Sequence, residues 1–262
     1  MRQVYVRRYN RLITERRFPE ALALDKEQLS LMDKHDISEQ AKSRVQVMSE
    51  IAQLSGEMGD TSTLLEYGAL LSGIVEKVPF AERHTSLISL PLLATVAKYY
   101  DMTGDFARAD SAWVSLLKVN TSLGNYAANL TGYAAFLASY GNTDKALGLY
   151  DEAIGILRTV GDLGAAALAA TDKAQCAKNV KKWDVMEQAC AETADIVSEM
   201  GDGSGISDAM RWDVAYRLAT FYSYAGDNDM AIKIYQELLP QYLADKNYKQ
   251  LAVTSADLGT AY

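Results

Sequence analysis

The chain has few of the residues that catalytic and metal sites use. Its 262 residues include two histidines and two cysteines, and neither His35 nor His84 has a second His or a Cys at metal-ligand spacing. We expect both histidines to be surface or cap residues. The glycine-rich segment 201–205 lacks the Gly-Lys-Ser/Thr of a phosphate loop, and no serine lies in Gly-x-Ser-x-Gly. We therefore expect a loop at 201–205 and no catalytic residue, metal site or cofactor.

Long apolar runs and a basic stripe are also absent. No stretch of about 18 apolar residues occurs, so no membrane span is predicted within this segment. The net charge of -8 argues against binding of nucleic acid, which needs a basic surface to displace counterions from phosphate. The one basic cluster is interpreted as a solvated helix face, with contact to an acidic partner or an upstream domain as the alternative; it comprises Arg2, Arg7, Arg8, Arg11, Arg16 and Arg17.

The scarcity of proline favours helices. The chain has only four prolines, and Ala, Leu, Met, Lys and Glu are abundant. Cys176 and Cys190 lie on opposite sides of a predicted turn at Lys181, about 8 Å and about 13 Å along their helices. With a helix spacing of about 8–10 Å, this offset predicts two buried free thiols and no disulfide.

A short turn motif returns along the chain. A Gly-Asp or Gly-Asn pair precedes a small residue and then a large apolar one, with turn positions at 16, 59, 104, 141, 181 and 226. Lys181 stands where glycine is expected, and the copy at Gly59 is the least regular. Intervals of 37 to 45 residues predict stacked helix pairs that cannot bury their faces alone. We predict an all-α solenoid of about six helix pairs and a final half-pair, forming one domain over 1–262.

Residues 92–119 illustrate one unit. A stripe of apolar residues ends at Gly104, which is expected to adopt the left-handed conformation that closes a helix. Asp105 is then expected to cap the next helix. Ala97 and Ala109 predict a close helix approach, with Tyr100, Phe106 and Trp113 filling the space around them.

These positions resemble the tetratricopeptide repeat. In three units the small, aromatic and glycine positions match that family, namely Ala97, Tyr100, Gly104, Phe106, Ala109 and Trp113; Ala134, Leu137, Gly141, Ala146, Tyr150 and Ala153; and Ala219, Tyr222, Gly226, Ala231, Tyr235 and Leu238. The resemblance implies a right-handed α-solenoid. Residues 258–262 repeat the family's Leu-Gly-x-x-Tyr opening, from which we expect a fragment of a longer chain.

A second set of turn pairs explains why the units exceed the family's 34 residues. Each is expected to close a lengthened second helix and to cap the next first helix; they are Gly124-Asn125, Gly161-Asp162 and Gly201-Asp202, with His35-Asp36 and Lys246-Asn247 as weaker copies. This long variant is similar to repeats in kinesin light chains and in bacterial two-component sensor histidine kinases or regulators.

The resemblance implies a concave groove lined by the first helices of successive units. By this register, the groove residues are Lys98, Asp101, Thr131, Ala135, Ala138, Gln175, Lys178, Tyr216, Thr220, Ser223 and Tyr224. They lack the Lys and Arg ladder that an Hsp90-tail adaptor would need. Capture of an extended peptide or a helix is one interpretation, and a solvated inner face is the other. Most of the six tyrosines near these helices are expected in the core: 99, 100, 133, 140, 222 and 224.

The resemblance favours a non-catalytic sensory or scaffold module of a larger bacterial signalling protein, with a sensor histidine kinase as the specific hypothesis. A stand-alone adaptor and a peptide-responsive regulator are the alternatives. The expected partner is a protein, a peptide or a neighbouring domain of the same chain, and not nucleic acid. The compartment would be periplasmic for a sensor-kinase input region and cytoplasmic for an adaptor or regulator.

Overall fold

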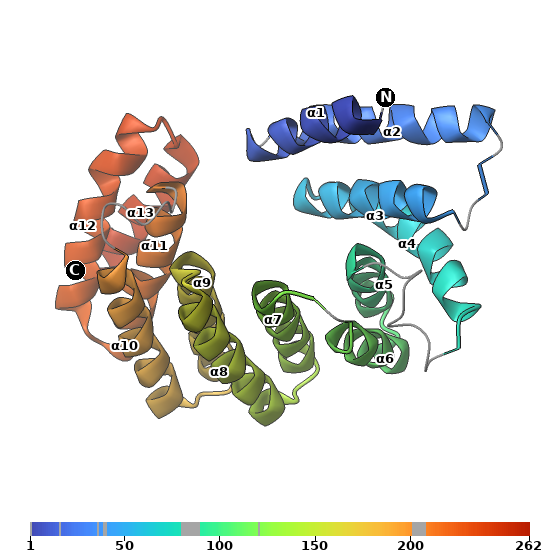
Figure 1. Cartoon of the computed structure of the whole chain (residues 1–262). Coiled ribbons are helices and arrows are strands. Elements are labelled where there is room, and N and C mark those ends of the chain that lie inside the picture. Colours follow the sequence, from blue (N-terminus) through green and yellow to red (C-terminus); the bar gives the residue numbers. More distant parts are fainter. Residues whose placement is uncertain are drawn as a thin grey trace. The chain divides into compact units, whose positions relative to one another are not determined.

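The computed structural model describes residues 2–15, 17–35, 37–38, 41–79, 90–119, 121–200 and 208–262. These residues form thirteen α-helices, and no strand occurs among them (Figure 1). The chain divides into two compact units, Met1–Asn120 and Thr121–Tyr262. Each unit is described by itself.

The described residues of the first unit form six helices. They are α1 (Arg2–Thr14), α2 (Phe18–Lys34), α3 (Lys42–Glu57), α4 (Thr61–Glu76), α5 (Leu90–Met102) and α6 (Phe106–Leu117). Each helix packs against the next, and α3 also packs against α5. Ile51, Leu71 and Leu93 are fully buried between these helices, so burial of apolar side chains holds the stack together.

In the second unit, the part of the chain that the structure describes forms seven helices. They are α7 (Leu123–Ser139), α8 (Thr143–Val160), α9 (Leu163–Asn179), α10 (Trp183–Glu199), α11 (Asp208–Ala225), α12 (Asn228–Ala244) and α13 (Tyr248–Ala261). In addition to neighbours in sequence, α7 packs against α9, α9 against α11, and α11 against α13. The predicted all-α repeat solenoid of helix pairs is therefore confirmed.

The turns within pairs follow the predicted chemistry. Gly104, Gly141 and Gly226 have φ of 78°, 82° and 84°, and the carboxylate of Asp105 accepts a hydrogen bond from the N–H of Arg108. Lys181 adopts the same left-handed conformation, with φ of 60°. The degenerate copy of the motif thus keeps the backbone geometry although it lacks glycine.

The turns between pairs confirm only part of the prediction. Gly161 closes α8 in the left-handed conformation, and Asp162 and Asn247 cap α9 and α13. The prediction for Gly124-Asn125 is wrong: Ser122 caps α7, and Gly124 lies inside that helix. Ser122 caps this helix instead, because its hydroxyl accepts a hydrogen bond from the backbone N–H of Asn125. Asp36 and the segment 201–207 lie outside the described residues.

The predicted core of residues 92–119 is largely confirmed. Ala97 and Ala109 are fully buried, as the close helix approach requires. Phe106 is the exception, because it begins α6 and is 39% exposed. Of the six tyrosines, most of which were expected in the core, Tyr100 and Tyr133 are buried, whereas Tyr140 and Tyr224 are exposed at 41% and 59%; Tyr224 was also predicted to face the groove. Tyr140 is the C-cap residue of α7, and Tyr224 lies in the last turn of α11.

The polar and sulfur residues singled out in the sequence behave as expected where they are described. Cys176 and Cys190 are free and buried, and burial raises the pKa of the Cys190 thiol to about 11. His35 is the exposed C-cap of α2, whereas His84 lies outside the described residues. No described helix is both long and apolar enough to cross a membrane.

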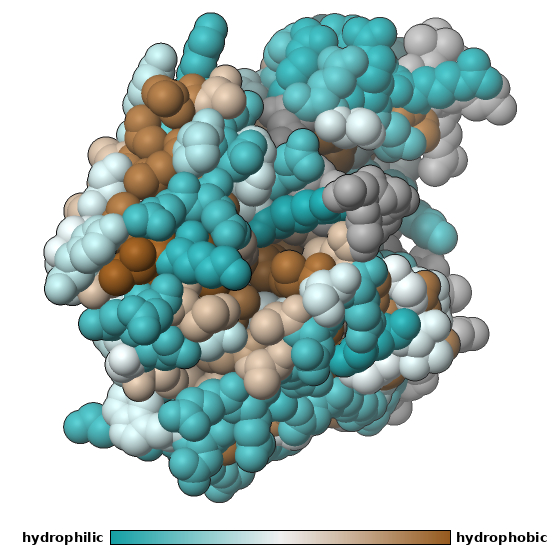
Figure 2. Space-filling model, turned by 90° about the vertical axis from the view of Figure 1, so that its left-hand side faces the viewer, coloured by the Kyte–Doolittle hydropathy of each residue, from teal (hydrophilic) through white to brown (hydrophobic). Residues whose placement is uncertain are grey.

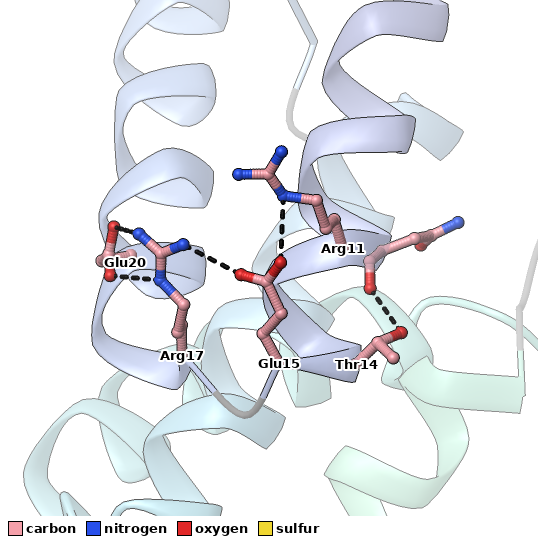
Figure 3. Close-up of polar contacts among 6 residues, drawn as sticks. Arg11, Thr14, Glu15, Arg17 and Glu20 are labelled. Atoms are coloured by element: carbon pink, nitrogen blue, oxygen red, sulfur yellow. Dashed lines mark hydrogen bonds and ion pairs between the residues drawn. The ribbon is translucent and has the colours of Figure 1, made fainter.

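Two arginines of the basic N-terminal cluster, Arg11 and Arg17, take part in a local ion-pair network. Glu15 lies between Arg11 and Arg17, at 3.2 Å and 2.9 Å, and Arg17 also contacts Glu20 (Figure 3). The hydrogen bond from Arg17 is the main cause that lowers the pKa of the Glu20 carboxyl. All four side chains are exposed, so the network contributes little stability and fits a solvated helix face.

Candidate partner-binding groove

Helices α7, α8 and α9 line an open cavity with a volume of about 280 Å³. Its walls come from α7, α8 and α9 and comprise Ala135, Ala138, Ser139, Tyr150, Asp172, Gln175, Cys176 and Asn179. Ala135, Ala138 and Gln175 were predicted for the groove, and the cavity brings them together. Because both alanines carry only a methyl group, the space between α7 and α9 stays open.

Amide and carboxylate groups give this cavity its polarity. Gln175 donates from Nε2 to Oδ1 of Asn179 at 2.6 Å along one face of α9. The side-chain carbonyl of Gln175 can still accept a hydrogen bond, and the side-chain amide of Asn179 can still donate one. The pair can therefore bind the main chain of a peptide. Tyr150 closes the floor of the cavity, and burial is the main cause that raises the pKa of its hydroxyl.

Asp172 extends the polar lining toward α11. Its Oδ1 lies 3.1 Å from Nη1 of Arg217, which also pairs through Nε with Asp213 at 3.1 Å. Burial raises the pKa of the Asp172 carboxyl, and the charge of Arg217 opposes that shift. The sequence analysis missed Asp172 and Arg217. Their positions in the sequence could have indicated them. Asp172 lies three residues before Gln175, on the same helix face, and Arg217 lies four residues after Asp213, at ion-pair spacing.

Two predicted groove residues contact each other across α9 and α11. Nζ of Lys178 lies 3.6 Å from the centroid of the Tyr224 ring, a distance at which a cation is attracted to the ring face. The same contact explains why Tyr224 can remain exposed. Ser223, its neighbour, is half-buried in the last turn of α11.

Other predicted groove residues are engaged within the protein. Tyr216 donates its hydroxyl to Oδ2 of Asp257 on α13 at 2.6 Å, and burial is the first cause that raises its pKa. The Thr220 hydroxyl donates to the carbonyl of Tyr216, and the Thr131 hydroxyl to that of Ala127. Tyr216 therefore links α11 to α13, and Thr220 links α11 to α12 by accepting a hydrogen bond from the Tyr235 hydroxyl at 3.2 Å. The Thr131 hydroxyl bonds within its own helix.

Lys98 and Asp101 belong to the first unit. Lys98 is exposed on α5, and its Nζ lies next to Gly56 of α3. A Cβ added to Gly56 would lie 3.2 Å from this nitrogen. Asp101 is half-buried one turn later on the same helix. The remaining predicted residues lie in the second unit, where Ala135, Ala138 and Gln175 line one pocket and Lys178 contacts Tyr224.

The surface of the last helices is mixed in polarity. Figure 2 shows polar side chains over most of the face that α10 to α13 turn to the viewer, with patches of apolar side chains between them. Exposed apolar residues on α12 and α13 include Leu243 and Val253. Scattered apolar exposure is ordinary for a protein surface. The described residues contain no group of three or more His, Cys, Asp or Glu that could hold a metal ion.

Sequence comparisons give no relative, whereas structure comparisons give many. No family model matches the chain, and no curated protein sequence does. BtubC (BKLC) from P. vanneervenii superposes with a TM-score of 0.59 at 17% identity, covering 89% of this chain and 92% of that one. A Rap protein complexed with Competence and Sporulation Factor gives 0.61 at 13% identity, covering 98% and 73%.

A third neighbour carries the repeat in its description. A signal transduction ATPase with a tetratricopeptide repeat sensor, from Pyrococcus horikoshii, superposes with a TM-score of 0.60 at 14% identity. It covers 99% of this chain, which spans 43% of that one. The chain has a tetratricopeptide-repeat fold. At these identities the likeness concerns the fold, and the groove residues must be judged by their own chemistry.

Proposed function

We propose that the chain is a non-catalytic protein- or peptide-binding module, and that the cavity between α7 and α9 receives an extended peptide. The observation that carries this proposal is the cavity's lining. Two alanines leave room for a main chain, while Gln175 and Asn179 offer amide groups at its edge. Extended peptides are held by main-chain hydrogen bonds of this kind, with adjacent pockets selecting side chains.

The remaining predicted groove residues would extend the contact along α11. Within the second unit, the proposed further contacts are Thr131, Lys178, Tyr216, Thr220, Ser223 and Tyr224. In the first unit, Lys98 and Asp101 are proposed as contacts in their own right. Two of the structural neighbours fit such a role. One was solved with Competence and Sporulation Factor, and another is described as carrying a repeat sensor.

The test is to fill the cavity. Ala135 is exposed at the cavity wall, so Ala135→Trp should obstruct the groove without overpacking the core. After a peptide array has identified a ligand, we expect Ala135→Trp to weaken binding at least tenfold, about 1.4 kcal/mol. Ala191→Trp, at an exposed position of α10, is the matched control and should bind as the wild type does. Equal affinity of both variants would refute the cavity as the site.

The wider proposal is that this module is the sensory or scaffold part of a larger bacterial signalling protein. A sensor histidine kinase is the specific form, supported by the long repeat variant that the sequence resembles. The peptide-responsive regulator is the second candidate, favoured by the Rap neighbour. The parent reading frame decides between them: a kinase module after the repeats supports the sensor, whereas a stop codon within one further helix leaves a regulator or adaptor.

A further inference from the structure

The first unit contains a separate cavity of about 110 Å³ among α1, α2 and α3. Tyr5 and Tyr9 line it from α1, Gln28 from α2, and Gln46 and Glu50 from α3. Its lining differs from that of the groove between α7 and α9, because aromatic rings and acceptor groups replace the alanines. The inference that follows does not depend on the proposed function.

The α1 wall presents aromatic surface. The rings of Tyr5 and Tyr9 lie 6.1 Å apart and are nearly parallel, with an interplanar angle of 17°. The hydroxyl of Tyr5 donates to Oδ1 of Asp25, which lies behind this wall and is 0% exposed. The ring faces of tyrosine carry partial negative charge, which attracts a cation.

Two buried acceptor atoms lie without a donor near the cavity, one on Gln28 in its lining and one on Asp25 behind the α1 wall, and the lining also includes the polar residues Asn10 and Ser43. Oε1 of Gln28 and Oδ2 of Asp25 are buried, and no described residue donates a hydrogen bond to either. Glu50 accepts one hydrogen bond, from Nε2 of Gln46 at 3.0 Å. Buried acceptors without a donor are rare and destabilising. The cavity therefore offers acceptor positions to a ligand that brings donors.

The two carboxyl groups near the cavity, Asp25 and Glu50, are both negatively charged when ionised. Burial raises the pKa of the Asp25 carboxyl to about 7, with the charge of Glu50 as a smaller cause. Burial also raises the pKa of Glu50. Among the described residues, two carboxyl groups thus lie at or just behind the cavity, and no basic side chain shifts the pKa of either.

We propose that this cavity binds a primary ammonium group, carried by a lysine side chain or by a free alkylamine. An ammonium group has three donors and no acceptor, so it can reach Oε1 of Gln28 and the carboxylate of Glu50 together. Its alkyl stem packs along the rings of Tyr5 and Tyr9. Asp25 adds negative charge from behind the Tyr5 hydroxyl. Binding favours the ionised carboxylates, so protons are released as the cation enters.

The experiment titrates the full chain with n-butylammonium and follows amide resonances, with 1-butanol as the uncharged isostere and KCl to match ionic strength. We expect saturable shifts confined to α1, α2 and α3 for n-butylammonium only. Calorimetry in two buffers of different ionisation enthalpy should show proton release. Glu50→Gln should weaken binding at least tenfold, and Glu57→Gln, an exposed position on α3, should leave it unchanged.

Two further probes separate the sources of the ammonium group. The site is assigned to a lysine side chain if acetyl-Gly-Lys-Gly-amide binds more tightly than both its norleucine analogue and n-butylammonium. It is assigned to a free amine if n-butylammonium binds more tightly than the lysine peptide. Equal responses to n-butylammonium and 1-butanol would overturn the proposal. So would unchanged affinity in a folded Glu50→Gln variant, a response to KCl alone, absence of a saturable shift, or tighter binding of n-butylguanidinium.

Discussion

Lys178 and Tyr224 form a cation–π contact between α9 and α11, with Nζ 3.6 Å from the ring centroid. Because Tyr224 is largely exposed, we expect a coupling energy of about 0.5–1 kcal/mol. A double-mutant cycle with Lys178→Met and Tyr224→Leu, read by urea unfolding, measures it. Pairing Tyr224→Leu with Lys233→Met on α12 provides a control pair that should show no coupling. Zero coupling in both cycles would mean that the contact contributes nothing to stability.

Lys181 occupies a left-handed turn that glycine adopts more easily. Its φ of 60° matches the conformation of Gly141 and Gly226 at the equivalent turns. A side chain in this region costs about 1–2 kcal/mol, and the greater freedom of glycine in the unfolded chain offsets part of the gain. We expect Lys181→Gly to stabilise the protein by about 0.5–1 kcal/mol.

The control for Lys181→Gly is the same substitution within a helix. Lys233→Gly, at an exposed position of α12, should destabilise by about 1 kcal/mol because glycine is a poor helix former. Thermal melts of both variants give the comparison. A Lys181→Gly variant that melts below the wild type would show that the lysine side chain contributes more than its backbone conformation costs.

These turns show what the sequence could predict. A glycine or its substitute every 37 to 45 residues predicts the helix pairs because turn and cap chemistry are local, and a carboxylate caps the following helix at Asp60, Asp105 and Asp227. Gly59 looked least regular, yet it has φ of 75°, and Asp60 caps α4 through the N–H of Thr63. Gly124 looked like a helix stop and is not one, since Ser122 lies two residues earlier with its own capping hydroxyl.

The candidate site was less predictable than the fold. Register along one helix placed Lys178, Tyr216 and Tyr224 on the first helices, but it could not say which side chains would be engaged across helices. Tyr216 is held by Asp257, and Asp172 by Arg217. These pairs depend on the offset between neighbouring helices, which the pattern within one helix does not contain. The cavity near Glu50 likewise combines residues from three helices.

Gly68 is required by the close approach of α4 and α5. A Cβ at Gly68 would lie 2.8 Å from two carbon atoms of Tyr99, whereas one at Gly73 on the same helix would meet nothing within 4 Å. We expect Gly68→Ala to destabilise by about 1–3 kcal/mol through overpacking. Gly73→Ala should stabilise by about 0.5–1 kcal/mol, since alanine is the better helix former.

Chemical denaturation of these two glycine variants separates the two effects, because both add one methyl group to the same helix. Opposite signs are the expected result. If Gly68→Ala were as stable as Gly73→Ala, α4 and α5 would not approach as closely as described, and the ring of Tyr99 would have room to move aside.

The stability of the first unit should fall as pH rises through the acid range. In the folded state burial raises the pKa of Asp25 to about 7, whereas an unfolded aspartate titrates near 4. Between these values the folded chain binds more protons than the unfolded chain, so the free energy of unfolding decreases with increasing pH. At about 1.4 kcal/mol per pKa unit, the loss attributable to Asp25 is at most about 4 kcal/mol.

Asp25→Asn isolates this contribution, because asparagine keeps an acceptor for the Tyr5 hydroxyl and cannot ionise. The groups that face Asp25 are Tyr5 and Tyr9 from α1 and Glu50 from α3. The pKa of each tyrosine is raised, so neither loses a proton in this range. The raised pKa of Glu50 acts in the same direction as that of Asp25. We expect urea unfolding between pH 4 and pH 8 to show a downward slope in the wild type that is reduced in Asp25→Asn. Parallel curves for the two proteins would mean that Asp25 ionises equally in the folded and unfolded chain, and its burial would then be compensated by a positive charge.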